Sequence, residues 1–258
     1  MPRRPTPSRP PLSRRDFLRL LSAAGASALI PRGAWALGPS SKLVFGLLDY
    51  GPGSDPRPTA LRRLAWEVVK RTSVEAELEA QHLSVDAPEL FLRPFLVLAG
   101  AGALPPLSPA HAARLRTHLT YGGTLLIDSS EGGPGSPFDQ SARAWAAQIL
   151  PKAPLQNLPR KHVLYKSFYL LDEPSGRARR SPYLEGAELD GRFAIIYSQN
   201  DLLGAWARDD LGMWEHEVDP RRRELAFRLG VNLVMYSMCG DYKDDQVHLP
   251  FIRKRRRS

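Results

Sequence analysis

Polar side chains follow several apolar runs of this chain, and their chemistry is that of a binding surface. A guanidinium pairs with a carboxylate, carboxylates accept hydrogen bonds from hydroxyl groups, and an indole ring can stack on a sugar or a peptide. We expect a ligand-binding site lined by Asp49, Asp55, Arg57, Asp128, Asn200, Asp201, Trp206 and Asp209. No nucleophile with an adjacent base is identifiable among these residues. We therefore expect the site to bind a ligand, and we assign no catalytic residue.

Two other interpretations of the polar residues stay open. Asp128, Ser129 and His162 could together supply the acid, nucleophile and base of a hydrolase acting on a carbohydrate or an amide. The residues around Ser129 depart, however, from the Gly-x-Ser-x-Gly turn of known hydrolases. The third interpretation is purely structural, because Asp and Asn commonly fix turns and cap helices.

The sequence gives no sign of a metal or a cofactor. The spacings of a zinc-protease helix, an EF-hand and a phosphate-binding P-loop are all absent. Cys239 is the only cysteine, which excludes cysteine-rich zinc and iron–sulfur sites within the chain. Gly100 and Gly102 lack the third glycine of a dinucleotide-binding loop. We therefore predict no metal site and no cofactor.

Apolar strands and amphipathic helices alternate through the first half of the chain. The pattern predicts strands over 42–48, 74–83, 95–99 and 124–127. Helices are expected to begin at Thr59, at Ser108 and at Asp139, each residue serving as the cap. This alternation indicates a parallel sheet covered on both faces, in which polar residues at the carboxyl ends of the strands come together.

The second half of the chain is less regular. Strands are predicted over 168–171, 183–188 and 193–198. The last two are joined by Asp190-Gly191, a pair that favours a tight β-hairpin turn. A final helix is expected over 224–238, apolar on most sides and therefore deeply packed.

The first 36 residues have the composition of an export signal. Ser13-Arg14-Arg15-Asp16-Phe17-Leu18 precedes the apolar run 20–30, and Ala34-Trp35-Ala36 offers a small-residue cleavage site. The paired arginines resemble a twin-arginine signal, whose cargo crosses the membrane already folded. We expect a periplasmic or otherwise exported protein. The apolar run is too short to span a bilayer, and no transmembrane helix is expected in the mature chain.

Basic residues concentrate at the two ends of the chain. The formal net charge is +9, but seven arginines lie in the first 36 residues and five basic residues lie in 253–257. The part between them is nearly neutral, which argues against a nucleic-acid partner. We divide the chain into a signal peptide (1–36), one α/β domain (37–252) and a basic tail (253–258).

Several segments together resemble one bacterial family, catalogued as domain of unknown function 4159. They are Asp55-Pro56-Arg57-Pro58-Thr59-Ala60-Leu61, Phe138-Asp139-Gln140-Ser141-Ala142-Arg143, Tyr183-Leu184-Glu185-Gly186, Tyr197-Ser198-Gln199-Asn200-Asp201-Leu202, Gly204-Ala205-Trp206 and Tyr242-Lys243-Asp244-Asp245-Gln246-Val247-His248. The resemblance implies a flavodoxin-like fold similar to class I glutamine amidotransferases, a mostly parallel sheet with helices on both faces and here an added β-hairpin in the C-terminal half. The cysteine nucleophile of those enzymes has no counterpart at any strand exit here.

The family's genes are often found near those for MoxR-type ATPases and von Willebrand A-domain proteins. The resemblance therefore implies partners among envelope proteins of that kind. Together with the leader, it leads us to expect a non-catalytic domain of the cell envelope that binds a ligand or a partner. If the alternative interpretation as a hydrolase holds, we expect the substrate to be a carbohydrate or an amide of the cell envelope.

Overall fold

The computed structural model of this chain describes residues 42–130 and 133–238. The predicted signal peptide, the basic tail and Cys239 lie outside these residues. All structural statements below concern the described part of the chain.

Seven strands form one mixed sheet in the order β2-β1-β3-β4-β7-β6-β5. The strands are β1 (Gly46–Leu48), β2 (Gln81–Leu83), β3 (Phe95–Gly100), β4 (Thr124–Ser129), β5 (Gln156–Asn157), β6 (Glu185–Leu189) and β7 (Arg192–Ser198). The first five in this order are parallel, and β6 and β5 add antiparallel pairs at one edge. The parallel order is that of flavodoxin-like folds, so the predicted fold class is confirmed.

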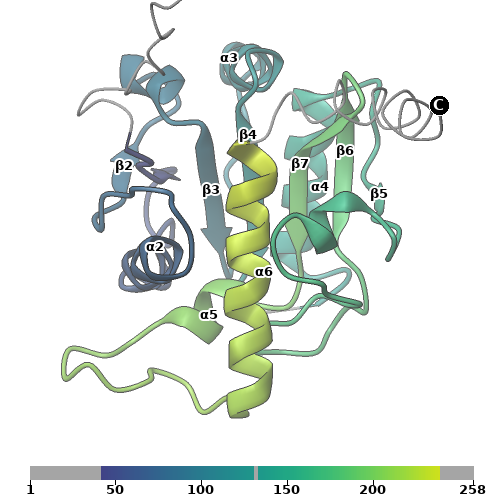
Figure 1. Ribbon diagram of the computed structural model, residues 1–258. Coiled ribbons are helices and arrows are strands. Elements are labelled where there is room, and N and C mark those ends of the chain that lie inside the picture. The colour runs from purple at the N-terminus through teal and green to yellow at the C-terminus, as the bar shows by residue number, and fades with distance from the viewer. Residues whose placement is uncertain (1–41, 131–132, 239–258) are drawn as a thin grey trace, which may run out of the picture. The chain divides into compact units, whose positions relative to one another are not determined.

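Helices cover both faces of the sheet (Figure 1). The buried residues of α2 (Ala60–Arg71), α5 (Leu202–Trp206) and α6 (Pro220–Met238) share one apolar core, and those of α3 (Pro109–Thr120) and α4 (Pro137–Ile149) share the other. Two short 3₁₀ helices complete the elements, η3 (Pro88–Leu92) and η4 (Val163–Lys166). Along β3, Phe95 and Val97 enter the first core while Leu96 and Leu98 enter the second. Burial on both faces explains why this strand is a continuous apolar run.

The hairpin between β6 and β7 forms as its turn residues predict. Asp190 and Gly191 both have positive φ, 50° and 77°. A turn of this kind needs positive φ at both central positions, which Asp and Gly tolerate better than other residues. The turn brings β7 back beside β4, so that its carboxyl end lies level with the end of that strand.

Three predicted strands differ from the structure. Residues 168–171 form no strand, because the backbone N–H groups of Phe168 and Tyr169 donate to Asn232 Oδ1 on α6 (3.2 and 2.7 Å) instead of to a neighbouring strand. The predicted strands over 42–48 and 74–83 are reduced to β1 and β2, with one further isolated bridge between Leu43 and Ala76.

Two predicted helix caps were also wrong. Ser136, not Asp139, caps α4, since its hydroxyl accepts from the N–H of Asp139 (3.2 Å). Asp139, the third residue of the helix, instead accepts from the N–H of Gly135 (2.7 Å), the residue before the cap. Thr59 precedes α2, but its hydroxyl bonds both backbone groups of Arg208 (2.7 Å each) and does not cap the helix.

Among the described helices, none has the length and apolar composition needed to cross a bilayer.

Candidate functional site

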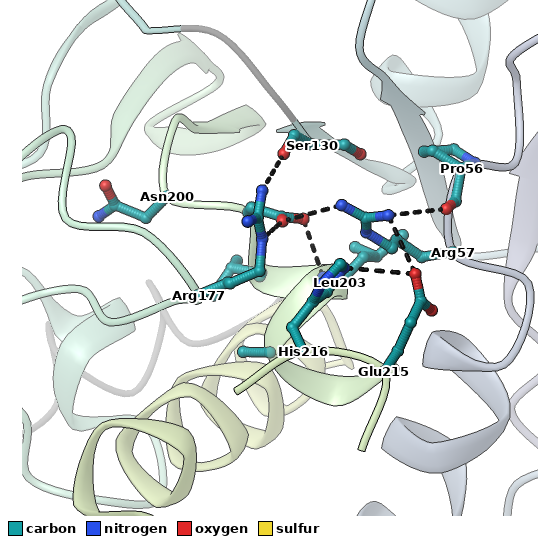
Figure 2. Close-up of polar contacts among 12 residues, drawn as sticks. Pro56, Arg57, Ser130, Arg177, Asn200, Leu203, Glu215 and His216 are labelled. Atoms are coloured by element: carbon teal, nitrogen blue, oxygen red, sulfur yellow. Dashed lines mark hydrogen bonds and ion pairs between the residues drawn. The ribbon is translucent and has the colours of Figure 1, made fainter. Parts of the chain in front are cut away.

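The carboxyl ends of β1, β4 and β7 bring one polar network together (Figure 2). Arg57 comes from the loop after β1, Ser130 directly follows β4, and Asp201 lies three residues beyond β7. The register Asp128↔Ser198 aligns the ends of β4 and β7. This edge is where open α/β sheets bind their ligands.

Asp201 is the centre of the network. It is fully buried and has φ 52°, a left-handed conformation that aspartate tolerates better than most residues. Its Oδ1 accepts from the N–H of Gly204 (2.8 Å) and so caps α5. Its Oδ2 faces two guanidinium groups, Arg57 at 3.4 Å and Arg177, whose Nε donates to the same oxygen. Two cations therefore share one carboxylate oxygen.

Asn200 positions the segment that carries Arg177. Its Oδ1 accepts from the N–H groups of Arg180 (2.8 Å) and Ser181 (2.9 Å), and its Nδ2 donates to the Ser181 carbonyl (2.8 Å). A side chain at Gly176 would collide with the Asn200 carbonyl, so the close approach requires glycine. Asn200 thus acts through backbone and does not face a ligand, which corrects its predicted role.

Arg57 and Glu215 extend the network toward solvent. Arg57 donates to Glu215 Oε1 (3.1 Å) and to the Pro56 carbonyl (3.3 Å). His216 Nε2 lies 3.3 Å from the same Glu215 oxygen. Partial burial and the positive charges of Arg57 and Arg177 lower the pKa of His216, which favours its neutral form at pH 7.

Asp128 holds the start of α5, the helix that follows Asp201. It is fully buried, and its two carboxylate oxygens accept from the N–H groups of Leu202 and Leu203 (3.0 Å each) at the start of α5. Burial and the nearby charge of Asp201 raise the pKa of Asp128 to about 7, although these backbone donors favour the ionised form. Because both oxygens are occupied by backbone, Asp128 orients α5 and is not positioned to meet a ligand.

The network leaves polar atoms without partners. Within residues 42–130 and 133–238, Arg57 Nε, Ser130 Oγ and His216 Nε2 are buried and make no hydrogen bond. Arg177 Nη2 reaches the Ser130 carbonyl (2.9 Å), which ties the end of β4 to the two arginines. A buried donor without an acceptor is costly, about 1–3 kcal/mol. The site is therefore short of acceptor oxygens.

Asp49 and Asp55 form a separate cluster at the ends of β1 and β2. Asp49 Oδ1 accepts from the Gly51 N–H (2.9 Å) and from Ser54 Oγ (3.0 Å), which fixes the turn after β1. Asp55 Oδ2 lies 3.4 Å from His82 Nε2. Burial raises the pKa of Asp55, while His82 and the backbone N–H of Arg57 oppose the shift. These carboxylates shape the loop that carries Arg57.

Tyr50 occupies the position between β1 and β3 where the strand order of the sheet reverses. Its hydroxyl donates to the carbonyls of Ala99 (2.8 Å) and Gly53 (2.9 Å). A Cβ at Gly100 would collide with that hydroxyl. Tyr50 therefore fills the space at the ends of β1 and β3. The polar network lies nearer to β4 and β7.

Trp206 and Asp209 lie away from the network. Trp206 has no exposed surface and stacks on Phe227 of α6 with ring centroids 6.3 Å apart, so the prediction that it stacks on a ligand is wrong. Asp209 lies in an exposed turn, where its Oδ1 accepts from the N–H groups of Leu211 (3.0 Å) and Met213 (2.7 Å). Trp206 therefore packs the core, and Asp209 stabilises a turn.

The predicted hydrolase residues do not meet. His162 packs against Phe193 at the start of β7 (4.9 Å between ring centroids) and against Tyr236 (5.6 Å). Ser129 ends β4 at the opposite edge of the sheet, beyond the pairing of Asp128 with Ser198. Phe193 and Ser198 are five positions apart along β7, roughly 16 Å. His162 therefore cannot act as a base for Ser129.

Arg177, Glu215, His216 and Ser130 belong to the network but were not among the predicted binding residues. Arg177 lies in an irregular segment 24 residues before Asp201, and Glu215 and His216 lie in the loop between α5 and α6. No local pattern marks these residues, because their roles come from contacts with distant segments. In the described part of the chain, no three His, Cys, Asp or Glu side chains are grouped so that they could hold a metal ion.

Comparison with known proteins adds family membership to this geometry. The search of curated proteins found no match. The family model described as "Domain of unknown function (DUF4159)" matches residues 44–238, which include every strand and helix of the sheet and all residues of the polar network. The chain therefore belongs to the DUF4159 family.

Proposed function

We propose that this chain is an exported, non-catalytic domain of the cell envelope that binds a carboxylate-bearing ligand at the carboxyl edge of its sheet. The ligand would be a peptide end or an acidic sugar, held between Arg57 and Arg177. The leader with Arg14 and Arg15 supports export by the twin-arginine route. Genes of the DUF4159 family are often found near those for MoxR-type ATPases and von Willebrand A-domain proteins, which suggests envelope proteins of these two types as partners.

The shortage of acceptor oxygens around Asp201 is the observation that carries this proposal. Arg57 and Arg177 share one carboxylate oxygen, and Arg57 Nε and Ser130 Oγ make no hydrogen bond within the described residues. A ligand carboxylate would supply the missing acceptors, and guanidinium groups bind carboxylates in a planar, bidentate manner. The Arg177 side chain is 24% exposed, which gives a ligand access from solvent.

Binding is favoured over hydrolysis because the network has no nucleophile with a base in reach. His162 lies at the other edge of the sheet, and Asp128 has both oxygens occupied by backbone N–H groups. His216 is next to the network, but its nearest charged neighbours are Glu215 and two arginines. These contacts suit recognition of charge and hydrogen-bonding groups.

Titration with paired ligands tests the proposal. Purified protein would be titrated calorimetrically with a dipeptide that has a free carboxylate, with its amide, with glucuronic acid and with glucose. We expect only the two carboxylates to bind. Arg177→Gln should weaken them about tenfold, a loss of about 1.4 kcal/mol.

Arg179→Gln is the matched control, because Arg179 lies on the same segment with 74% of its side chain exposed. Equal affinity for carboxylates and amides, or equal losses in Arg177→Gln and Arg179→Gln, would contradict the proposed site. Steady consumption of either carboxylate would contradict the non-catalytic role.

Export is tested separately. Replacing Arg14 and Arg15 together by lysine should leave uncleaved protein in the cytoplasm, measured by fractionation and immunoblotting. Normal processing of that double variant would rule out the twin-arginine route.

A further inference from the structure

A pocket of about 310 Å³ lies between α2 and α6. Arg63 and Arg71 of α2, Arg223 and Phe227 of α6, and Trp214 and Val218 of the loop before α6 line it. Its volume is at the lower end of the range for small-molecule sites. Trp214 belongs to this pocket, while the next residue, Glu215, pairs with Arg57. The two sites are thus adjacent but use different side chains.

Arginines surround the aromatic side chains of the pocket. The guanidinium of Arg223 lies 3.9 Å from the centre of the Trp214 ring, and that of Arg208 lies 4.0 Å from it. Arg63 and Arg71 lie 5.7 and 5.8 Å from the Phe227 ring. These contacts hold the arginines in place and leave the pocket walls partly apolar.

The acidic residues of the pocket neutralise only part of this charge. Glu67 pairs with Arg63 and Arg71, and Glu224 binds Arg71 through both oxygens (2.8 and 2.9 Å). Arg223, by contrast, donates to the carbonyls of Ala205 (2.8 Å) and His216 (2.7 Å). No carboxylate among the described residues forms an ion pair with Arg223.

Arg208 adds to the uncompensated charge. It too has no carboxylate partner within the described ranges, where its Nη1 donates to the Gly212 carbonyl. Burial and the charge of Arg208 lower the pKa of Arg63 and of Arg223, while Glu67 opposes the shift of Arg63, so Arg208 repels both cations. The Nε atoms of Arg63 and Arg208 are buried without a partner in the described part of the chain.

We propose that this pocket binds a small organic oxyanion, with its charged group near Arg63 and Arg223 and its apolar body against Phe227 and Val218. An oxyanion would neutralise the arginine cluster and accept from donors that have no acceptor. A neutral ligand of the same shape gains only the apolar contact and binds far more weakly. The site does not depend on the carboxylate site at Asp201.

Benzoate, phenyl phosphate and neutral benzyl alcohol serve as probes for the purified full-length chain, titrated calorimetrically in low-salt buffer without phosphate. We expect at least one of the two anions to bind and benzyl alcohol not to bind. Whichever anion binds more tightly identifies the preferred oxyanion. The Arg63→Gln variant should weaken that anion about tenfold, because the most exposed arginine of the pocket is removed.

Arg62→Gln is the matched control, since Arg62 is the neighbouring residue of α2, is 60% exposed and pairs outside the pocket with Glu79. Its affinity should stay within about twofold of the unaltered protein. Arg208→Gln is a second variant, which should also weaken the anion, and near-ultraviolet circular dichroism checks that each variant is folded. Arg57→Gln should leave this affinity unchanged.

Failure of both anions to bind would overturn the inference. Equal losses in Arg63→Gln and Arg62→Gln would do the same, since they would indicate a general charge effect. Loss of binding in Arg57→Gln with Arg63→Gln unaffected would place the anion at the carboxyl edge of the sheet, which would support the first site and refute the second.

Discussion

Replacing Asp201 by asparagine removes the central charge of the polar network and almost nothing else. Asparagine has the same shape, tolerates positive φ and is an equally good helix cap, so the bond to the Gly204 N–H is kept. What is lost is the negative charge that Arg57 and Arg177 share. The variant therefore isolates the electrostatic contribution.

The burial of the three side chains sets the expected loss. Asp201 is fully buried, and the Arg57 and Arg177 side chains are 10% and 24% exposed. Removing one partner of a buried ion pair typically costs 3–5 kcal/mol. Arg57 keeps its pair with Glu215, so we expect the lower end, about 3 kcal/mol. For a domain of this size the melting temperature should fall by roughly 6–12 °C.

Urea unfolding followed by circular dichroism measures the change in the free energy of unfolding. Asp209→Asn is the control, because Asp209 is exposed in a turn and its loss should change stability by less than about 0.5–1 kcal/mol. A loss below about 1 kcal/mol in Asp201→Asn would show that water screens the arginines, and the buried network as described would be wrong.

Two further predictions concern the core beneath the site. Because burial raises the pKa of Asp128 to about 7, the native state binds a proton more tightly than the unfolded chain. The contribution of Asp128 to stability is then complete below about pH 4 and is lost as the pH rises through about 7. Asp128→Asn should therefore flatten the dependence of the free energy of unfolding on pH between those values, measured by urea unfolding at each pH. An unchanged pH dependence would contradict the raised pKa of Asp128. Gly230→Ala should destabilise the protein by about 1 kcal/mol in thermal unfolding, because the new methyl group would lie 2.5 Å from Leu64 and 2.8 Å from the rigid Trp206 ring. This steric cost should outweigh the better helix propensity of alanine. A stabilised variant would show that the neighbouring side chains move to make room for the methyl group.

Much of the fold could be predicted from local sequence signals. The apolar run at 95–99 forms β3, and Asp190-Gly191 forms the predicted hairpin turn. Both signals act over a few residues, through burial on two faces and through backbone conformation. The strand expected at 168–171 failed because Asn232, more than sixty residues away, takes the backbone donors of that segment.

The candidate site was predictable only in part. Asp128 lies at the carboxyl end of β4, and Arg57 and Asp201 follow β1 and β7, so parallel topology alone brings the three residues together. The strand pattern could not indicate that Asn200 bonds only backbone, nor that Arg177 completes the network. These outcomes depend on how an irregular segment folds back over the end of β7.

By itself, the sequence determined which residues form the alternating strands and helices and which polar residues leave the sheet at its carboxyl edge, because periodicity and turn propensity are properties of short segments. Tertiary structure alone decided that Trp206 is buried under α6, that His162 lies at the far edge from Ser129, and that two arginines meet at Asp201. Burial and charge pairing arise from contacts between segments far apart in the chain, and their energies depend on neighbours that no local pattern specifies.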